Sequence, residues 1–230
     1  MVKNENCWLK DNCNRIDCNK PNCIKLIKLD YLFDQACVDL NMRKNVDLFL
    51  TTEQDRKAFS TLANIKENIN EFIKNGSNLY IYSSNVGNGK SVWALKLLQA
   101  YIYSIWSNSK LECKALWIHV PQFLLALKDN ISEKSDYIAH IKKNILDCDL
   151  VIFDEFGEKT STQFETEHLL SYINTRLSLG KSCIYTSNIK PEELSLIVGE
   201  RLASRVIGLS NVIEFKGKDM RKASMQLKNV

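Results

Sequence analysis

The sequence contains little glycine and proline and no long hydrophobic run. It has 8 Gly and 3 Pro among 230 residues, too few for the many tight turns of an all-β protein or for a collagen-like or linker-like chain. No apolar run approaches the roughly 18 residues that span a bilayer, and the N-terminus has no apolar signal-peptide core. We therefore expect a soluble, cytoplasmic protein with no membrane partner.

The charged residues are nearly balanced, with 31 Lys and Arg against 27 Asp and Glu and a net charge of +4. Hydrophobic residues make up 45% of the chain, as in ordinary folded proteins. The basic excess lies at the C-terminus, where five Lys or Arg residues and one Asp occur within residues 216–230. Such a tail binds nucleic acid or the phosphates of a nucleotide, or is simply solvated.

From residue 79 the sequence alternates short apolar segments with helical ones. Strands are expected at residues 79–83, 115–120, 150–153, 182–186 and 212–215. Helices are expected at 89–105, 121–127, 136–145, 164–179, 191–197 and 199–206, and an earlier one from a cap at Thr51 or Thr52 through Phe72. Strands that are apolar on both faces and separated by helices predict an α/β fold with a five-stranded parallel sheet between helices.

The first of these strands leads into a phosphate-loop (P-loop) motif. The motif consists of Ser84, Asn85, Val86, Gly87, Asn88, Gly89, Lys90 and Ser91. It fits the pattern G-x-x-x-x-G-K-[ST] except that serine stands at the first glycine. Glycines let backbone N–H groups approach phosphate oxygens, and the helix that follows directs its positive end at them. Lys90 is expected to bind the β- and γ-phosphates of ATP, and the Ser91 hydroxyl a Mg²⁺ ion.

Two later strands end in polar residues at the same predicted edge of the sheet. The strand at 150–153 is followed by Asp154 and Glu155, and the strand at 182–186 by Ser187 and Asn188. We expect Asp154 to hold Mg²⁺ and Glu155 to polarise the attacking water. Asn188 is expected to orient that water or to contact the γ-phosphate. These residue types predict hydrolysis of ATP to ADP and phosphate.

The order and spacing of several segments resemble one family of P-loop proteins. The segments are SSNVGNGKS, LVIFDEFGE, YINTR, IYTSN, GERLASRV and VIEFKGKDMR. Together they resemble AAA+ ATPases, specifically the DnaC/DnaI-type bacterial and phage helicase loaders and the related IstB transposition helpers, over about residues 50–225. The resemblance implies that Asn188 is sensor I, that Arg205 (rather than Arg201) is an arginine finger for a neighbouring subunit, and that Arg221 is sensor II. It also implies a short or absent lid after Arg221.

The same resemblance implies binding partners. A helicase loader binds a replicative hexameric helicase, places it on single-stranded DNA during initiation of replication, and self-associates through the ATP site. The stretch 121–146 stands where this group carries an insertion, and its lysines would line a path for single-stranded DNA. These lysines are Lys128, Lys134, Lys142 and Lys143.

Four of the 8 cysteines lie close together near the N-terminus: Cys7, Cys13, Cys18 and Cys23. Four thiolates suit tetrahedral Zn²⁺, and a metal would supply the folding energy that this polar segment lacks. The spacing differs from that of common zinc sites, so an iron–sulfur cluster and free thiols are alternatives. We expect residues 1–50 to form a Cys-rich module and linker that docks a partner, and residues 51–230 to form the ATPase domain. The other cysteines are expected in the core, and the three isolated histidines receive no chemical role.

Three other functions compete with the helicase loader. An IstB-like helper of a transposase would use the same ATPase motifs on duplex DNA. An adaptor that binds ATP but hydrolyses almost none would fit the replacement of the first P-loop glycine by Ser84. An initiator such as DnaA is less expected, because the nine residues that follow Arg221 are too few for a helix-turn-helix domain.

Overall fold

The computed structural model describes residues 7–9, 13, 23–44, 53–129, 134–158 and 162–219. The strands are β1 (Leu79–Tyr82), β2 (Ala115–His119), β3 (Leu150–Asp154), β4 (Ser182–Ser187) and β5 (Asn211–Glu214). The helices are α1 (Ile24–Gln35), α2 (Arg56–Glu67), α3 (Ile69–Lys74), α4 (Lys90–Ile105), α5 (Val120–Asp129), α6 (Asp136–Asn144), α7 (Gln163–Ser178), α8 (Leu194–Val198) and α9 (Glu200–Gly208). Short 3-10 helices occur at Leu40–Arg43 and Glu53–Asp55.

The five strands form one parallel sheet in the order β2-β3-β4-β1-β5. The predicted α/β fold with a five-stranded parallel sheet between helices is therefore confirmed. Because all five strands are parallel, the loop that follows β1 lies at the same carboxyl edge of the sheet as the ends of β3 and β4. In the strand order, β1 is directly next to β4. The carboxyl edge of an open parallel sheet is where ligands bind in α/β proteins.

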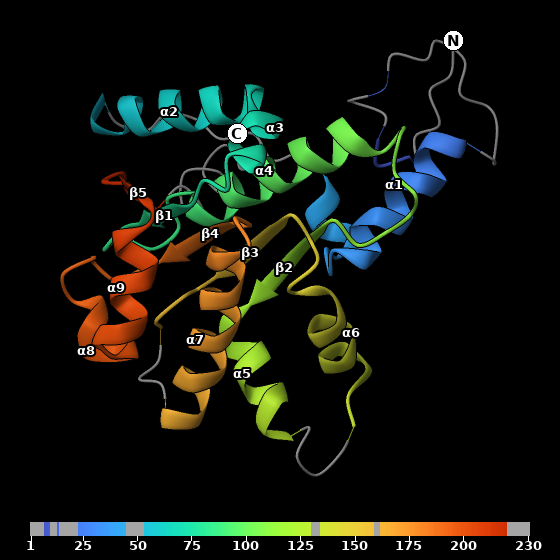
Figure 1. Cartoon of the computed structure of the whole chain (residues 1–230). Helices are drawn as coiled ribbons and strands as arrows, with labels where there is room; N and C mark the ends of the chain where they lie inside the picture. The colour runs from blue at the N-terminus through green and yellow to red at the C-terminus, as the bar shows by residue number, and fades with distance from the viewer. Residues whose placement is uncertain are drawn as a thin grey trace, which may run out of the picture.

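Each face of the sheet packs against its own set of helices. In β1, Leu79 and Ile81 contribute to a first core together with apolar residues of α1, α2, α3 and α4. Tyr80 points to the other face and joins a second core with residues of α5, α6, α7, α8 and α9. Figure 1 shows this layering, with α4 on one face of the sheet and α5 and α7 on the other. Among the helices of the described residues, none is both long and apolar enough to cross a membrane.

The segment that precedes the P-loop domain contributes to the first core. Leu29 and Phe33 of α1 are fully buried there, and Leu9 is also buried in this core. The sequence of residues 1–24 lacks an apolar periodicity that could build a separate core. Leu9 packs instead in the core that contains residues of α1 and α4. The backbone N–H of Trp117 in β2 also donates to the carbonyl of Ala36, 2.8 Å away. The expected boundary at residue 50 stays a prediction, while residues on both sides of it share one core.

The single helix predicted from Thr51 or Thr52 through Phe72 is divided in the structure. Both threonines lie outside the described residues, and the helix α2 begins at Arg56. A break at Asn68 separates α2 from α3, and here the carbonyl oxygen of Asn64 accepts from both the side chain and the backbone N–H of Asn68, at 3.0 and 3.1 Å. Asparagine amides compete in this way with the helical hydrogen bonds of the backbone. The apolar positions on both sides of the break, Leu62 and Phe72, are still buried.

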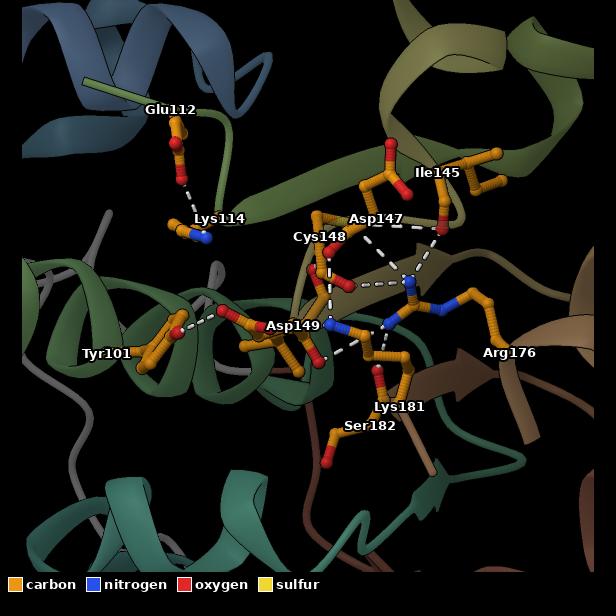
Figure 2. A network of polar contacts seen from close by, with 11 residues as sticks. Tyr101, Glu112, Lys114, Ile145, Asp147, Cys148, Asp149, Arg176, Lys181 and Ser182 are labelled. Atoms are coloured by element: carbon orange, nitrogen blue, oxygen red, sulfur yellow. Dashed lines mark hydrogen bonds and ion pairs between the residues drawn. The ribbon is translucent and has the colours of Figure 1, made fainter. Parts of the chain in front are cut away.

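A buried arginine ties together the amino-terminal ends of β3 and β4. Arg176 at the end of α7 is fully buried, and its guanidinium donates to the carbonyl oxygens of Ile145 (2.6 Å), Cys148 (2.9 Å) and Ser182 (2.7 Å). Figure 2 shows these carbonyl groups gathered around the guanidinium. Beside them, Asp149 pairs with Lys181 and also accepts a hydrogen bond from the Tyr101 hydroxyl of α4. This network fixes the register of the two strands whose opposite ends carry the site.

Candidate functional site

The loop between β1 and α4 has the backbone conformation of an anion cradle. Gly87 and Gly89 have φ angles of +71° and +96°, which residues with a side chain rarely adopt. Gly89 is the N-cap residue of α4, and no side chain caps the helix there. The first N–H groups of α4 are therefore left for a ligand, and the helix dipole favours an anion at this position.

The side chains of the loop hold it in shape. The Ser83 hydroxyl accepts hydrogen bonds from the backbone N–H of Asn85 (3.0 Å) and from the amide nitrogen of Asn88 (2.5 Å). The Lys90 ammonium donates to the carbonyl of Asn85 at 3.2 Å and to the Asn88 side-chain oxygen at 3.4 Å. Lys90 is only 8% exposed, so its charge lies inside the loop, where phosphate oxygens would sit. Ser84 is exposed at the start of the loop.

Asn85 also connects the P-loop to the segment after β5. Its amide nitrogen lies 3.2 Å from the carbonyl oxygens of both Lys216 and Gly217. The N–H of Lys216 in turn donates to the buried carboxylate of Asp55 at 2.7 Å. The start of α2, the P-loop and the basic C-terminal segment are thus joined. Arg221, predicted as sensor II, lies outside the described residues, as does the region of the predicted lid.

Asp154 and Ser91 come together at the centre of the site. Asp154 is buried at the end of β3 and accepts hydrogen bonds from the hydroxyls of Ser91 and of Thr186, the latter at 2.5 Å. Burial raises the pKa of the Asp154 carboxyl, and the two hydroxyl hydrogen bonds partly oppose this effect. A hydroxyl and a carboxylate in contact are hard oxygen ligands of the kind that Mg²⁺ prefers. The donor set therefore fits a magnesium ion bound together with phosphate oxygens.

Glu155 adopts an unusual backbone conformation, with a φ of +57°. Its N–H donates to the Thr186 hydroxyl at 3.1 Å, which holds the turn against β4. Its carboxylate oxygen Oε2 lies 2.6 Å from Nε2 of His119 at the end of β2. The two side chains are 40% and 38% exposed, so both remain accessible to a ligand and to water. A residue held in this strained region is typical of functional sites.

Asn188, at the end of β4, contacts an acidic side chain. Its amide nitrogen donates to Oε1 of Glu158 at 2.5 Å. Glu155 and Glu158 both line a cavity of about 170 Å³ between α5, α7 and the loop after β3. An ion pair between Lys128 of α5 and Glu165 of α7, at 3.0 Å, borders the same cavity. Lys128, predicted to contact single-stranded DNA, is thus paired within the chain.

The two candidate finger residues lie on α9. Arg201 and Arg205 are exposed, while Leu202 and Val206 of the same helix are buried. Within the described part of the chain, no ion pair of Arg205 is formed. Among the described residues, Arg205 therefore forms no ion pair with the candidate nucleotide site of its own chain.

The N-terminal cysteines do not form a recognisable metal site among the described residues. Cys7 and Cys13 are partly buried against the first core, and Cys23 is buried just before α1. Cys18 lies outside the described residues. Within the described ranges, no group of three or more His, Cys, Asp or Glu side chains is placed to hold a metal ion. Binding of zinc or of an iron–sulfur cluster is therefore not supported and stays a prediction.

Three residues of the site received no role from the sequence: His119, Thr186 and Glu158. A usable signal existed for Thr186, because it belongs to the polar end of the same strand as Asn188. His119 stands at the end of its strand, as Asp154 does, and the β2–β3 register pairs these two residues. Only the strand order, which the sequence does not contain, shows that these ends are neighbours.

Comparison with known proteins agrees with this geometry. The bacterial DnaA ATPase domain family matches residues 40–211. The replicative helicase loader DnaC of Escherichia coli strain K12 is 23% identical over 147 residues, which cover 64% of this chain and 57% of the relative. The chain thus spans little more than half the length of this curated relative.

Solved structures with the same fold include a helicase loader and an initiator. The crystal structure of the DnaC helicase loader has a TM-score of 0.60 and 19% identity, covering 73% of this chain and 93% of that chain. The structure of the replication initiator DnaA bound to AMPPCP and single-stranded DNA has a TM-score of 0.57 and 21% identity, and the match covers 79% of this chain and 54% of that chain. Since the family match extends over most of the chain, the protein belongs to the bacterial DnaA ATPase domain family of AAA+ proteins and is related to the DnaC-type helicase loaders.

Proposed function

We propose that the protein is an ATP-hydrolysing helicase loader that delivers a replicative hexameric helicase to single-stranded DNA. The observation that carries the enzymatic part is the contact between Ser91 of the P-loop and Asp154 of β3. This contact supports the proposal, because it brings the P-loop and the Asp154 carboxylate together, beside Glu155. Such an arrangement positions ATP and its metal ion for phosphoryl transfer to water.

Each residue of the site has a distinct part in the proposed reaction. The N–H groups of residues 84–91 and the Lys90 ammonium would bind the phosphates of ATP. Ser91 and Asp154 would hold a Mg²⁺ ion, which would supply charge neutralisation for phosphoryl transfer. Glu155 accepts the proton of the attacking water, and Asn188 donates to the γ-phosphate or orients that water.

Residues from elsewhere complete the proposed site. Arg205 of a second copy stabilises the charge that develops on the transferred phosphate. Its exposure and its lack of an ion pair within the described chain support this role. Arg221 would contact the nucleotide of its own subunit, since the Asn85 contacts hold the segment before it against the P-loop.

The proposed partners follow from the relatives. DnaC is a replicative helicase loader by name, and one structural neighbour is an initiator bound to single-stranded DNA. In this chain, Lys134, Lys142 and Lys143 are exposed on or beside α6, where they could pair with phosphates. We further propose that residues 1–50, with Zn²⁺ on the four N-terminal cysteines, dock the helicase and that residues 51–230 form the ATPase domain.

The proposed helicase-loader function is tested by gel filtration of the protein mixed with the replicative helicase of its host. We expect a stable complex with ATP, a weaker one without it, and loss of ATP dependence in Lys90→Ala. Lys57→Ala removes an exposed lysine of α2 and serves as the matched control. Absence of a complex under every condition would favour the transposase helper, which a duplex-DNA binding assay would then test.

The ATPase activity is tested separately by phosphate release. The wild-type protein should release phosphate. The Glu155→Gln variant should bind ATP with near-normal affinity but release phosphate at least about 100-fold more slowly. Equal rates for the two proteins would instead identify an adaptor that binds nucleotide without turning it over.

A further inference from the structure

Glu158 stands between two residues of the proposed reaction. It follows Gly157 in the loop between β3 and α7, and its Oε1 accepts the hydrogen bond from the Asn188 amide nitrogen at 2.5 Å. Its carboxyl group also lies near that of Glu155, which precedes it on the same loop. Glu158 thus joins the end of β4 to the loop that carries the proposed general base.

The chemistry of the two side chains determines how Asn188 is oriented. An asparagine amide has a nitrogen with two N–H donors on one side and an accepting oxygen on the other. An ionised carboxylate can only accept hydrogen bonds. Glu158 therefore selects the nitrogen side of the Asn188 amide and uses one of its two N–H groups. The second N–H remains for a ligand.

Glu158 is exposed and lies among charged and polar side chains. It faces Glu155 on its own loop, His119 at the end of β2 and Asn188 just after β4. Burial and the charge of Glu155 raise the pKa of the Glu158 carboxyl, while the Asn188 hydrogen bond opposes this effect. The amide of Asn188 is the neutral donor in this group, so its contact with Glu158 adds no further charge to the site.

We propose that Glu158 is a positioning residue that orients the Asn188 amide, so that its free N–H faces the terminal phosphate of bound ATP. This inference rests on the proposed ATPase activity. It assigns Glu158 an effect on the rate of the chemical step and little effect on nucleotide affinity, because the groups proposed to bind the phosphates belong to the loop between β1 and α4, whereas Glu158 belongs to the loop after β3.

The test compares Glu158→Ala and Glu158→Gln with Glu71→Ala. Glu71 is an exposed residue of α3, next to Asn70, which contacts Ser104 at the end of α4 far from the P-loop. We expect Glu158→Ala to lower kcat about tenfold, the effect of one lost hydrogen bond to a charged group in the reacting state, with KM for ATP changed less than about twofold. Glu158→Gln should give an intermediate kcat, because its amide can accept or donate and so no longer selects one orientation. Glu71→Ala should match the wild type.

A second readout does not depend on turnover. In the nucleotide-free wild type, the side-chain amide signals of Asn188 in a ¹⁵N NMR spectrum should show one strongly shifted proton, which Glu158→Ala abolishes and Glu71→Ala leaves in place. An unchanged Asn188 signal, or an unchanged or raised kcat in Glu158→Ala, overturns the inference while the ATPase stands. If the wild type itself releases no phosphate, the proposed activity fails, and the inferred effect on catalysis fails with it.

Discussion

The Nε2 atom of His119 lies 2.6 Å from Oε2 of Glu155, so the proposed general base is already engaged by a side chain from the neighbouring strand. The parallel register of β2 and β3 pairs His119 with Asp154, which brings the next residue, Glu155, within reach. A carboxylate that shares a hydrogen bond with an imidazole is a poorer acceptor for the proton of a water molecule. The contact therefore restrains Glu155.

Removing this restraint should raise basal turnover. We predict that His119→Ala hydrolyses ATP about two- to fivefold faster than the wild type in the absence of partners, a small factor because both side chains are well exposed to solvent. Phosphate release at saturating ATP measures the effect. His168→Ala, which changes a histidine of α7 in edge-to-face contact with Phe164, is the control. A slower His119→Ala enzyme would show that the imidazole assists Glu155.

The buried Arg176 should be important for stability. Replacing it with methionine leaves the carbonyl oxygens of Ile145, Cys148 and Ser182 buried without their donor. We predict a loss of about 3–5 kcal/mol in the free energy of unfolding, measured by urea denaturation. Arg56→Ala, which breaks an exposed pair with Glu53, should change it by less than about 1 kcal/mol. Equal small effects would contradict the role assigned to the network in Figure 2.

The contribution of Asp149 should depend on pH. Burial alone would raise the pKa of Asp149, but hydrogen bonds from Lys181 and Tyr101 and the charge of Lys181 outweigh it, and the pKa is lowered overall. A group with a lowered pKa stabilises the fold above its unfolded value, near 4, and loses this effect as the pH falls through the folded value. Asp149→Asn should therefore cost about 1–2 kcal/mol at pH 7 and much less below about pH 3. Urea unfolding at several pH values tests this, and a constant difference would contradict it.

Gly76 and Gly208 offer a matched pair of substitutions. Gly76 has a φ of +61°, and a Cβ there would lie 2.5 Å from the carbonyl oxygen of Gly180. Gly208, at the end of α9, has nothing within 4 Å of such an atom. We predict that Gly76→Ala lowers the free energy of unfolding by about 2–4 kcal/mol. Gly208→Ala should leave it unchanged or raise it by up to about 1 kcal/mol. Thermal unfolding of both variants tests the close approach of the α3 and α7 ends.

The sheet could be predicted because its signals are local. Each strand is a short apolar run next to a helix, and the P-loop residues follow β1 directly in the sequence. The division of the helix at Asn68 was missed because the apolar spacing continues across it, and the helix α1 was missed because its buried residues depend on packing against α4.

The candidate site could be predicted only where a motif is continuous in the sequence. Ser91 and Asp154 were assigned from motifs, and the structure brings them into contact. His119 and Glu158 belong to no such motif, and their contacts with Glu155 and Asn188 arise from strand order and from a loop conformation. The sequence pattern does not specify which strand ends become neighbours. These two contacts could therefore be identified only from the three-dimensional structure.

The most direct test of the proposed function is transfer of the host's replicative helicase to a closed circle of single-stranded DNA, which a ring cannot thread from an end. We predict that helicase becomes bound to the circle only with this protein and ATP, and that Lys90→Ala abolishes the transfer while Lys57→Ala does not. Transfer that is equally efficient without the protein, or no transfer despite a stable complex, would contradict the assignment as a helicase loader.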